Sequence, residues 1–273
     1  MSKSKDSRTV GHYGAHYGNF ASELYAEIRE EAFGADIGQT GWLTADEQDL
    51  FIRWLGLSES DHVLDLACGS GEPTLRIAKM TGCRVTGVDL HDDGVANALA
   101  VSKDRGLETR ANFQQGNAAE KLDFEDSSFN AITCIDAINH LPNRGRVLEE
   151  WHRLLKPGGR LLFTDPIVLT GPITNEEIAI RASIGFFLFV PRGADEALLE
   201  QAKFEVEQIV DRTQNMADNA AGWLRARAKR ESDLRDIEGD EVFDGQQTFL
   251  ETAATLASEG RLSRFAILAK RKI

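Results

Sequence analysis

The stretch that decides the fold is Val63–Gly71, with the sequence VLDLACGSG. It begins as a short apolar strand. Gly69 and Gly71 then let the backbone turn tightly and pass close to a ligand, because glycine has no Cβ. The helix that we expect over Pro73–Thr81 presents unpaired N–H groups at its start. A strand, a glycine turn and a helix in this order indicate a ligand site at the edge of an open α/β sheet.

The chain after Asp61 alternates between strand-like and helix-like segments. Strands are expected at 62–68, 84–90, 111–116, 131–137 and 160–166, and helices at 73–81, 92–103 and 147–155, the last of them stopped by KPGG at 156–159. Such alternation predicts a Rossmann-like, doubly wound α/β sheet that is mostly parallel. Later strands at 204–211 and 263–270 complete seven strands, and the last strand is predicted to be antiparallel.

The remaining segments are predicted to be helical additions to this sheet. Residues 1–10 are expected to be a disordered tail, 11–57 a helical N-terminal lid, 58–170 the ligand-binding core, 171–262 a helical cap and 263–273 the final strand of the core. Thr44 and Glu47 have the spacing of a capping box. The stretches 171–203 and 213–260 are expected to be largely helical, and Ala217–Asp236 within the second is charged and amphipathic.

The overall composition excludes several classes of protein. The net charge is −13 and the pI is about 5.0. A protein that binds a phosphate backbone needs clustered Lys and Arg, and this acidic composition argues against it, so we expect no nucleic-acid partner. No apolar run approaches the ~20 residues of a membrane span, and no secretory signal is evident. Cys68, Cys83 and Cys134 form no CxxC pair and are expected to be free thiols in a cytoplasmic protein.

Acidic residues accompany the glycine turn at defined positions. Asp65 lies inside the first strand and gives the pattern D-x-x-x-G-x-G. A dinucleotide fingerprint would have a third glycine where this chain has Thr74, so that fingerprint fails. Asp89 ends the second strand, where a carboxylate can accept hydrogen bonds from two ribose hydroxyls. Asn117, in the sequence GNA, follows the third strand.

This ordered set resembles class I S-adenosylmethionine-dependent methyltransferases. The resemblance covers about Glu59–Val168 and includes the phrases FEDSSFN (124–130) and LLKPGGRLLFTDP (154–166). The chain is most similar to bacterial small-molecule methyltransferases of the sarcosine/dimethylglycine and ubiquinone types. It lacks the N-P-P-Y and D-P-P-Y tetrapeptides of DNA amino-methylating enzymes.

The resemblance implies S-adenosylmethionine as the cofactor and assigns roles around it. The acid in the first strand organises the turn, the glycines face the methionine part, the acid in the second strand holds the ribose, and Leu90 packs on the adenine. Asp136 is predicted to contact either the cofactor amino group or the acceptor. The predicted cofactor-binding residues are Asp65, Cys68, Gly69, Gly71, Asp89, Leu90, Asn117, Ala118 and Asp136.

Two residues at strand ends are candidates for the acceptor chemistry. His140 is predicted to be a general base, and its alternative is a structural histidine that bonds its loop or packs on the adenine. Asp165 is predicted to contact the acceptor, and its alternative is to cap the loop after the fifth strand. We predict no metal, because the Asp-Asn partner pair of catechol-type magnesium sites is missing.

The acceptor pocket is expected to form from Trp42, the apolar stretch Ile184–Val190, Trp223 and the cap helices. Aromatic side chains can hold an aromatic ring or a cationic amine. Arg181, Arg192 and Arg225 are candidates to bind an acceptor carboxylate, and the favoured alternative for each is a solvated surface position. The prediction is methyl transfer to an N, O or C atom of a small molecule by a monomer or homodimer. The alternatives are a catalytically degenerate cofactor-binding module and, less favoured, a Rossmann oxidoreductase.

Overall fold

The computed structural model describes residues 22–272. The predicted tail and the first part of the predicted lid, residues 11–21, lie outside them. In chain order the elements are α2 (Glu23–Phe33), α3 (Ala45–Leu55), β1 (His62–Leu66), α4 (Glu72–Thr81), β2 (Arg84–Asp89), α5 (Asp92–Asp104), β3 (Ala111–Gln115), β4 (Phe129–Cys134), the 3-10 helix η1 (Ile138–His140), α6 (Arg144–Leu154), β5 (Leu155–Leu169), α7 (Asn175–Arg181), β6 (Val190–Pro191), α8 (Ala194–Gln201), β7 (Phe204–Asp211), α9 (Thr213–Ala228), α10 (Glu231–Glu238), α11 (Asp240–Ser258) and β8 (Leu262–Arg271).

The strands form one mixed sheet in the order β3-β2-β1-β4-β5-β8-β7. Strands β1 to β5 pair in parallel, whereas β8 is antiparallel to both β5 and β7. The predicted Rossmann-like sheet with an antiparallel last strand is therefore confirmed. The sheet has an eighth member that the pattern did not indicate, the two-residue strand β6, which pairs with the end of β5.

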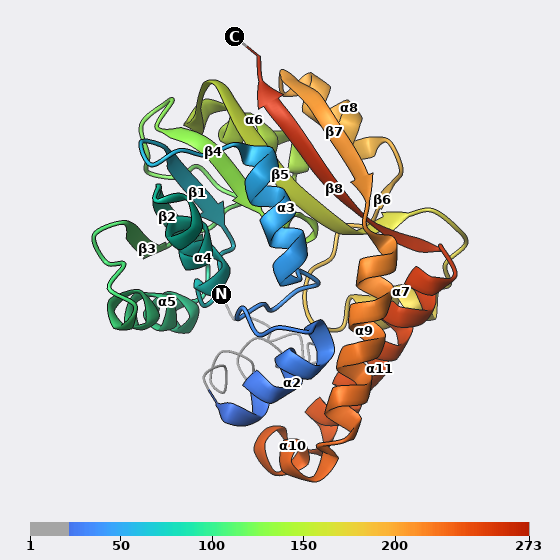
Figure 1. Ribbon diagram of the computed structural model, residues 1–273. Coiled ribbons are helices and arrows are strands. Elements are labelled where there is room, and N and C mark those ends of the chain that lie inside the picture. Colours follow the sequence, from blue (N-terminus) through green and yellow to red (C-terminus); the bar gives the residue numbers. More distant parts are fainter. Residues whose placement is uncertain (1–21, 273) are drawn as a thin grey trace, which may run out of the picture.

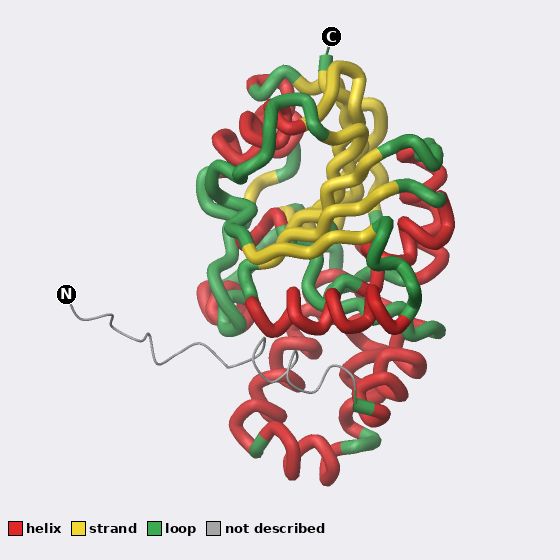
Figure 2. Tube along the Cα trace, turned by 90° about the vertical axis from the view of Figure 1, so that its left-hand side faces the viewer, coloured by secondary structure: helices red, strands yellow, loops and turns green. Residues whose placement is uncertain are grey.

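Helices cover both faces of this sheet, as Figure 2 shows with the twisted strands between red helices. One apolar core joins α3, α4 and α5 to the first face, and a second joins α6 and α8 to the opposite face. Parallel strands buried on both faces are the reason that β1 reads as an apolar run, without the alternation of a one-sided sheet. Its Val63, Leu64 and Leu66 are all fully buried.

The helical additions form a lobe beyond the sheet. In Figure 1, α9, α10 and α11 extend below the strands, and α2 packs beside α9. The lobe has its own apolar core, which includes Trp42, Ile184 and Trp223. The amphipathic stretch Ala217–Asp236 is helical, as expected, but it is divided between α9 and α10 at Lys229 and Arg230. No helix within residues 22–272 is both long and apolar enough to cross a membrane.

The glycine turn has the predicted strand–turn–helix form, with Gly71 as the N-cap of α4 at φ 78°. A Cβ at Gly71 would lie 2.5 Å from the Cβ of Ala98 and 2.8 Å from the ring of Phe113. The backbone conformation and the space both require glycine here. The turn is therefore fixed partly by its packing against α5 and β3.

The start of α3 differs from the expected capping box. The Thr44 hydroxyl accepts a hydrogen bond from the backbone N–H of Glu47, as predicted. The Glu47 carboxylate does not accept a hydrogen bond from the backbone N–H of Thr44. It binds Arg212 and the buried Arg264 instead, because two guanidinium cations compete for it more strongly than an amide does.

Candidate active site

A cavity of about 430 Å³ opens at the carboxyl ends of β1, β2 and β4, where open α/β sheets bind ligands. We call it the cofactor cavity. It brings together several residues that the sequence predicted for the cofactor or the chemistry. Its lining includes Asp89, Leu90, Asn117, Ala118, Asp136 and His140, together with Thr40, Gly41, Ile184, Gly185 and Phe186.

Asp89 is held at the end of β2 by backbone donors. The N–H of Gly69 donates to one of its carboxylate oxygens at 2.8 Å, and the N–H of His91 donates to the other at 2.9 Å. The side chain is 4% exposed and lines the cofactor cavity. Because each carboxylate oxygen has a further lone pair, Asp89 can still accept hydrogen bonds from a diol.

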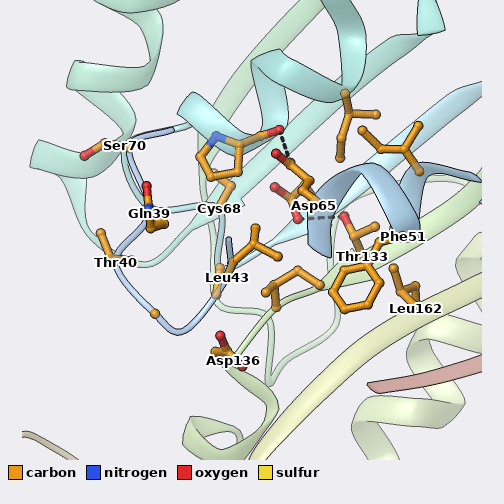
Figure 3. Close-up of a pocket in the computed structure, with 18 of the residues that line it drawn as sticks. Gln39, Thr40, Leu43, Phe51, Asp65, Cys68, Ser70, Thr133, Asp136 and Leu162 are labelled. Carbon is orange, nitrogen blue, oxygen red and sulfur yellow. Dashed lines mark hydrogen bonds between the residues drawn. The ribbon is translucent and has the colours of Figure 1, made fainter. Parts of the chain in front are cut away.

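Asp65 serves the turn from within the sheet. Its carboxylate accepts hydrogen bonds from the hydroxyls of Thr74 and Thr133, the latter at 2.7 Å. Burial raises the pKa of Asp65 to about 6, although both hydroxyls act to lower it. Thr74, which replaces the third glycine of a dinucleotide site, thus ties the start of α4 to β1. Figure 3 shows Asp65 and Thr133 side by side below the turn.

Two large apolar side chains stand exposed at the mouth of the cofactor cavity. Leu90 is 56% exposed and Phe186 is 55% exposed, and both line the cavity. Leu90 follows β2, whereas Phe186 belongs to the loop between α7 and β6. An exposed apolar pair at a cavity mouth is a surface on which a flat ring can pack.

Of the other predicted cofactor residues, Asn117 and Ala118 line this cavity, whereas Cys68 and Gly69 belong to the turn beside it. The carbonyl oxygen of Asn117 accepts from the N–H of Ala119 at 3.0 Å, and its amide donates to Glu120. Cys68 is buried beneath the turn, and burial raises the pKa of its thiol. Gly69 contributes its N–H to the carboxylate at the end of β2.

A second, smaller cavity lies between the glycine turn and the loop that precedes α3. We call residues 38–43 of this loop the strap. Strap residues line the cavity together with Asp65, Cys68 and Ser70, as the close-up in Figure 3 shows. The Ser70 hydroxyl is 1% exposed and has no hydrogen-bond partner among the described residues. A buried hydroxyl without a partner at the turn has its hydrogen-bonding capacity free for the polar end of a ligand.

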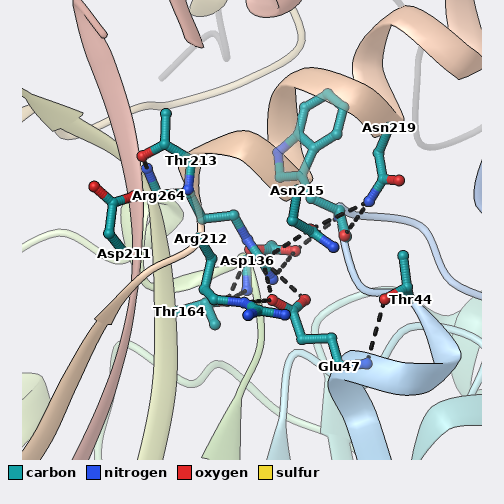
Figure 4. Close-up of polar contacts among 11 residues, drawn as sticks. Thr44, Glu47, Asp136, Thr164, Asp211, Arg212, Thr213, Asn215, Asn219 and Arg264 are labelled. Atoms are coloured by element: carbon teal, nitrogen blue, oxygen red, sulfur yellow. Dashed lines mark hydrogen bonds and ion pairs between the residues drawn. The ribbon is translucent and has the colours of Figure 1, made fainter. Parts of the chain in front are cut away.

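Asp136 is at the centre of a buried ionic network. Its carboxylate accepts hydrogen bonds from the strap N–H of Trp42 at 2.7 Å and from the hydroxyl of Thr164 at 2.7 Å. Arg264 donates to it at 2.6 Å and also to both oxygens of Glu47 at 2.8 Å. Burial alone would lower the pKa of Arg264, but Asp136 and Glu47 raise it. Figure 4 shows this convergence, which holds the strap over the sheet.

A third chamber lies under the helical lobe and shares Thr40, Gly41, Asp136, His140 and Ile184 with the cofactor cavity. We call it the acceptor chamber, of about 50 Å³. Its further lining is Trp42, Asn139, Pro166, Arg181, Phe187, Trp223, Gln246, Phe249 and Leu250. The predicted pocket residues Trp42 and Trp223 are thus brought together, with ring centroids 6.3 Å apart.

The aromatic side chains of the acceptor chamber surround a cation of the protein itself. Arg181 is 1% exposed, and its guanidinium carbon lies 4.2 Å from the ring centroid of Phe249. The same carbon is 5.7 Å from Phe187 and 5.9 Å from Trp42. These are cation–π distances.

His140 lies between the cofactor cavity and the acceptor chamber, where the sequence placed its candidate base. Its Nδ1 is 2.9 Å from the carbonyl oxygen of Phe186. A carbonyl only accepts, so Nδ1 carries the hydrogen and Nε2 carries the lone pair. Burial lowers the pKa of His140, and the charge of Arg181 lowers it further. The imidazole is therefore neutral near pH 7.

The structure places Asp165 away from this site. It is fully buried, lines neither the cofactor cavity nor the acceptor chamber, and pairs with Arg144 at 2.5 Å. The same guanidinium nitrogen donates to Asp195 at 2.7 Å. Burial and the neighbouring Asp165 raise the pKa of Asp195 to about 7. We therefore withdraw Asp165 as an acceptor contact. Within β5 it forms a buried cluster with Arg144 and Asp195, and it accepts the backbone N–H of Ile167 at 3.1 Å, which agrees with its alternative capping role.

Several residues of the site were not named individually from the sequence. Thr40 and Gly41 belong to the predicted N-terminal lid, and they reach all three cavities although they lie far from the sheet in sequence. Phe186 and Asn139 join from a loop and a 3-10 turn that have no motif. The apolar run Ile184–Val190 indicated the first of these segments, but nothing indicated which of its side chains face the site.

Comparison with known proteins gives the class of this chain. Residues 57–218, more than half of the chain, match the family described as methyltransferase domain. The chain therefore belongs to this family, and it is an S-adenosylmethionine-dependent methyltransferase.

The relatives and solved structures extend this result. The chain is 28% identical to 27-O-demethylrifamycin SV methyltransferase of Amycolatopsis mediterranei over 226 residues, which cover 78% of this chain and 81% of the relative. It is 38% identical to sterol 24-C-methyltransferase of Saccharomyces cerevisiae over 60% of this chain and 43% of the relative. A Galdieria sulphuraria structure described as a sarcosine dimethylglycine methyltransferase superimposes with a TM-score of 0.76 at 19% identity, covering 83% and 84% of the two chains. The [4+2]-cyclase SpnF also gives 0.76 at 21% identity over 97% of each chain. At these identities the structures show the fold alone.

Proposed function

We propose that this chain methylates an oxygen atom of a neutral or anionic small molecule, with His140 as the general base. The observation that carries the proposal is the guanidinium of Arg181 among the aromatic rings of the acceptor chamber. A relative that matches over most of its length is named for an O-demethylated rifamycin substrate, and this supports a small-molecule acceptor.

The charge of Arg181 favours one of the two kinds of acceptor that aromatic side chains can hold, an aromatic ring over a cationic amine. A cationic amine would have to share Phe187 and Phe249 with a guanidinium that already lies over them. Like charges at such short range repel strongly in a site from which water is excluded. The same guanidinium favours a carboxylate, a phenolate or an enolate oxygen.

The cofactor is proposed to lie along the carboxyl ends of the strands, with its adenosine part in the cofactor cavity and its methionine part in the smaller cavity beneath the strap. Asp89 would accept the ribose hydroxyls, Leu90 and Phe186 would enclose the adenine, and Ser70 would meet the methionine end beneath the strap. Bound there, the sulfonium supplies a methyl group that is already activated for displacement. The predicted roles of Asn117 and Ala118 at the adenine edge remain part of this proposal.

The protein's own contribution is to hold the acceptor oxygen in line and to remove its proton. The new C–O bond forms as the C–S bond breaks, and the electron pair of that bond returns to the sulfur. The proton of the hydroxyl passes to Nε2 of His140, which is the basic nitrogen because Nδ1 bonds Phe186. Positioning and water exclusion supply much of the rate in such a displacement.

The proposal is tested with a matched acceptor panel and cofactor carrying a labelled methyl group. Phenol, benzoate, aniline and benzylamine are incubated with the full chain, and both S-adenosylhomocysteine and methylated product are measured. Hydroxyl and carboxylate acceptors should react, and benzylamine should not. Preferred reaction of benzylamine, or no transfer to any acceptor despite cofactor binding, would refute the proposal.

Two histidine variants test whether His140 is the general base or has a structural role. His140→Ala should lower kcat by about 10²-fold or more and leave the cofactor Kd unchanged. The control is His152→Ala, because His152 packs on Phe204 and lines none of the three cavities. Unchanged turnover in His140→Ala would return His140 to a structural role.

A further inference from the structure

Asn139 is a buried amide that the fold leaves without partners. Its side chain is 1% exposed, and neither its nitrogen nor its oxygen makes a hydrogen bond to any described residue. It lines the acceptor chamber next to His140. Buried polar atoms are almost always hydrogen-bonded, so an amide unpaired at both ends requires an explanation.

The position of Asn139 is imposed by its backbone. The N–H of Leu188 donates to the carbonyl oxygen of Asn139 at 2.8 Å, and Arg144 donates to the carbonyl oxygen of Leu188 at 3.1 Å. Arg144 is itself fixed between Asp165 and Asp195. The buried cluster of Arg144, Asp165 and Asp195 therefore holds the turn that carries Asn139.

The same protein satisfies a comparable amide where the role is structural. Asn219, also buried, donates from its side chain to the carbonyl oxygen of Trp42 at 2.7 Å. Leaving a buried donor and acceptor unpaired is costly, and replacing them by an apolar group of the same size can stabilise a protein. Asn139 lies at the wall of a binding chamber, so a bound ligand can supply the hydrogen bonds that the protein does not.

We propose that Asn139 binds a second hydroxyl of the acceptor, separate from the oxygen that is methylated. This inference rests on the proposed function. A hydroxyl accepts from the amide N–H and donates to the amide oxygen, so it pairs with both ends of the side chain. A methoxy group accepts only, and a hydrogen does neither. Asn139 thus determines specificity for a polyhydroxylated acceptor.

Binding to the S-adenosylhomocysteine-loaded full chain tests this directly by calorimetry. Catechol and resorcinol are the dihydroxy probes, and phenol and 2-methoxyphenol are their matched controls. Wild type should bind one dihydroxy probe at least about tenfold more tightly than both controls, since a site built to bond a hydroxyl rejects analogues without it. Equal affinity for all four probes would overturn the inference.

Two variants separate ligand binding from a structural role. Asn139→Leu should abolish the preference for the dihydroxy probe and should leave Tm unchanged or raised. Asn139→Asp should keep part of the preference because it keeps an acceptor oxygen. A fall in Tm of several degrees in Asn139→Leu, with the preference retained, would show that the amide supports the fold and would overturn the inference.

The outcomes also separate this inference from the function on which it rests. If wild type discriminates the probes in binding but releases no S-adenosylhomocysteine with any hydroxyl acceptor, O-methylation fails and the role of Asn139 in binding stands. If hydroxyl acceptors are methylated without any discrimination between one and two hydroxyls, the proposed function stands and the inference fails.

Discussion

Glu47→Gln should destabilise the protein markedly, because it removes one charge from a buried network. The Glu47 side chain is fully buried, 2.8 Å from Arg264 and 2.6 Å from Arg212, and Arg264 is fully buried as well. Removing one member of a buried ion pair costs about 3 kcal/mol or more, since the remaining charge stays out of water. The N-cap of α3 survives the change, because Thr44 receives the backbone N–H of residue 47.

The expected change in Tm follows from the length of the chain. A protein of 273 residues has an unfolding entropy of about 0.57 kcal/mol/K at about 2.1 cal/mol/K per residue. A loss of about 3 kcal/mol therefore lowers Tm by about 5 °C. Scanning calorimetry measures this change, with far-UV circular dichroism to confirm that the variant folds.

A surface pair provides the control for this measurement. Asp244→Asn removes a contact of 2.7 Å to Arg235, but Asp244 is 65% exposed. Exposed pairs contribute little, so its Tm should stay within about 1 °C of wild type. If Glu47→Gln shifts Tm no more than this control does, the network does not hold the strap in the way that its geometry indicates.

Three further predictions concern the turn and the cofactor. Gly71→Ala places a Cβ 2.5 Å from the Cβ of Ala98 at a positive φ and should lower the free energy of unfolding by about 1–3 kcal/mol. Gly260→Ala is the control, because Gly260 also has a positive φ but nothing lies within 4 Å of its added Cβ, and it should cost less. Urea unfolding measures both variants, and equal losses of stability would contradict the packing argument. Burial raises the pKa of Asp65 from 3.8 to about 6, so its protonated form favours folding at low pH, and this contribution is lost as pH rises through about 6. Wild type should therefore lose stability relative to Asp65→Asn between pH 4 and pH 7, and parallel pH profiles of the two proteins would show that this titration is uncoupled from folding. Asp89→Asn should weaken S-adenosylmethionine binding by about tenfold or more, because a neutral amide is a poorer acceptor for ribose hydroxyls; an unchanged Kd in calorimetry would remove Asp89 from the cofactor site.

The agreement between sequence and structure is best where local patterns carry the information. The apolar run of β1, the acid at its centre and the acid at the end of β2 are all local, and each lies where its position in a strand predicted. The amphipathic pattern over Ala217–Asp236 indicated helix, but it did not indicate the break at Lys229 and Arg230, where α9 ends and α10 begins. Periodicity reports which face is apolar and does not report where a helix must bend to stay on its neighbour.

By itself the sequence determined the doubly wound sheet, the turn at Val63–Gly71 and the class of protein, because strand and helix periods, glycines and strand-end acids act over a few residues. Only the tertiary structure decided what surrounds the acceptor. It paired Asp165 of β5 with the buried Arg144, and it brought Asn139 to the wall of the acceptor chamber. The physical reason is that a buried charge or amide takes whichever partner the packed chain brings within about 3 Å, and those partners come from segments far apart in the sequence.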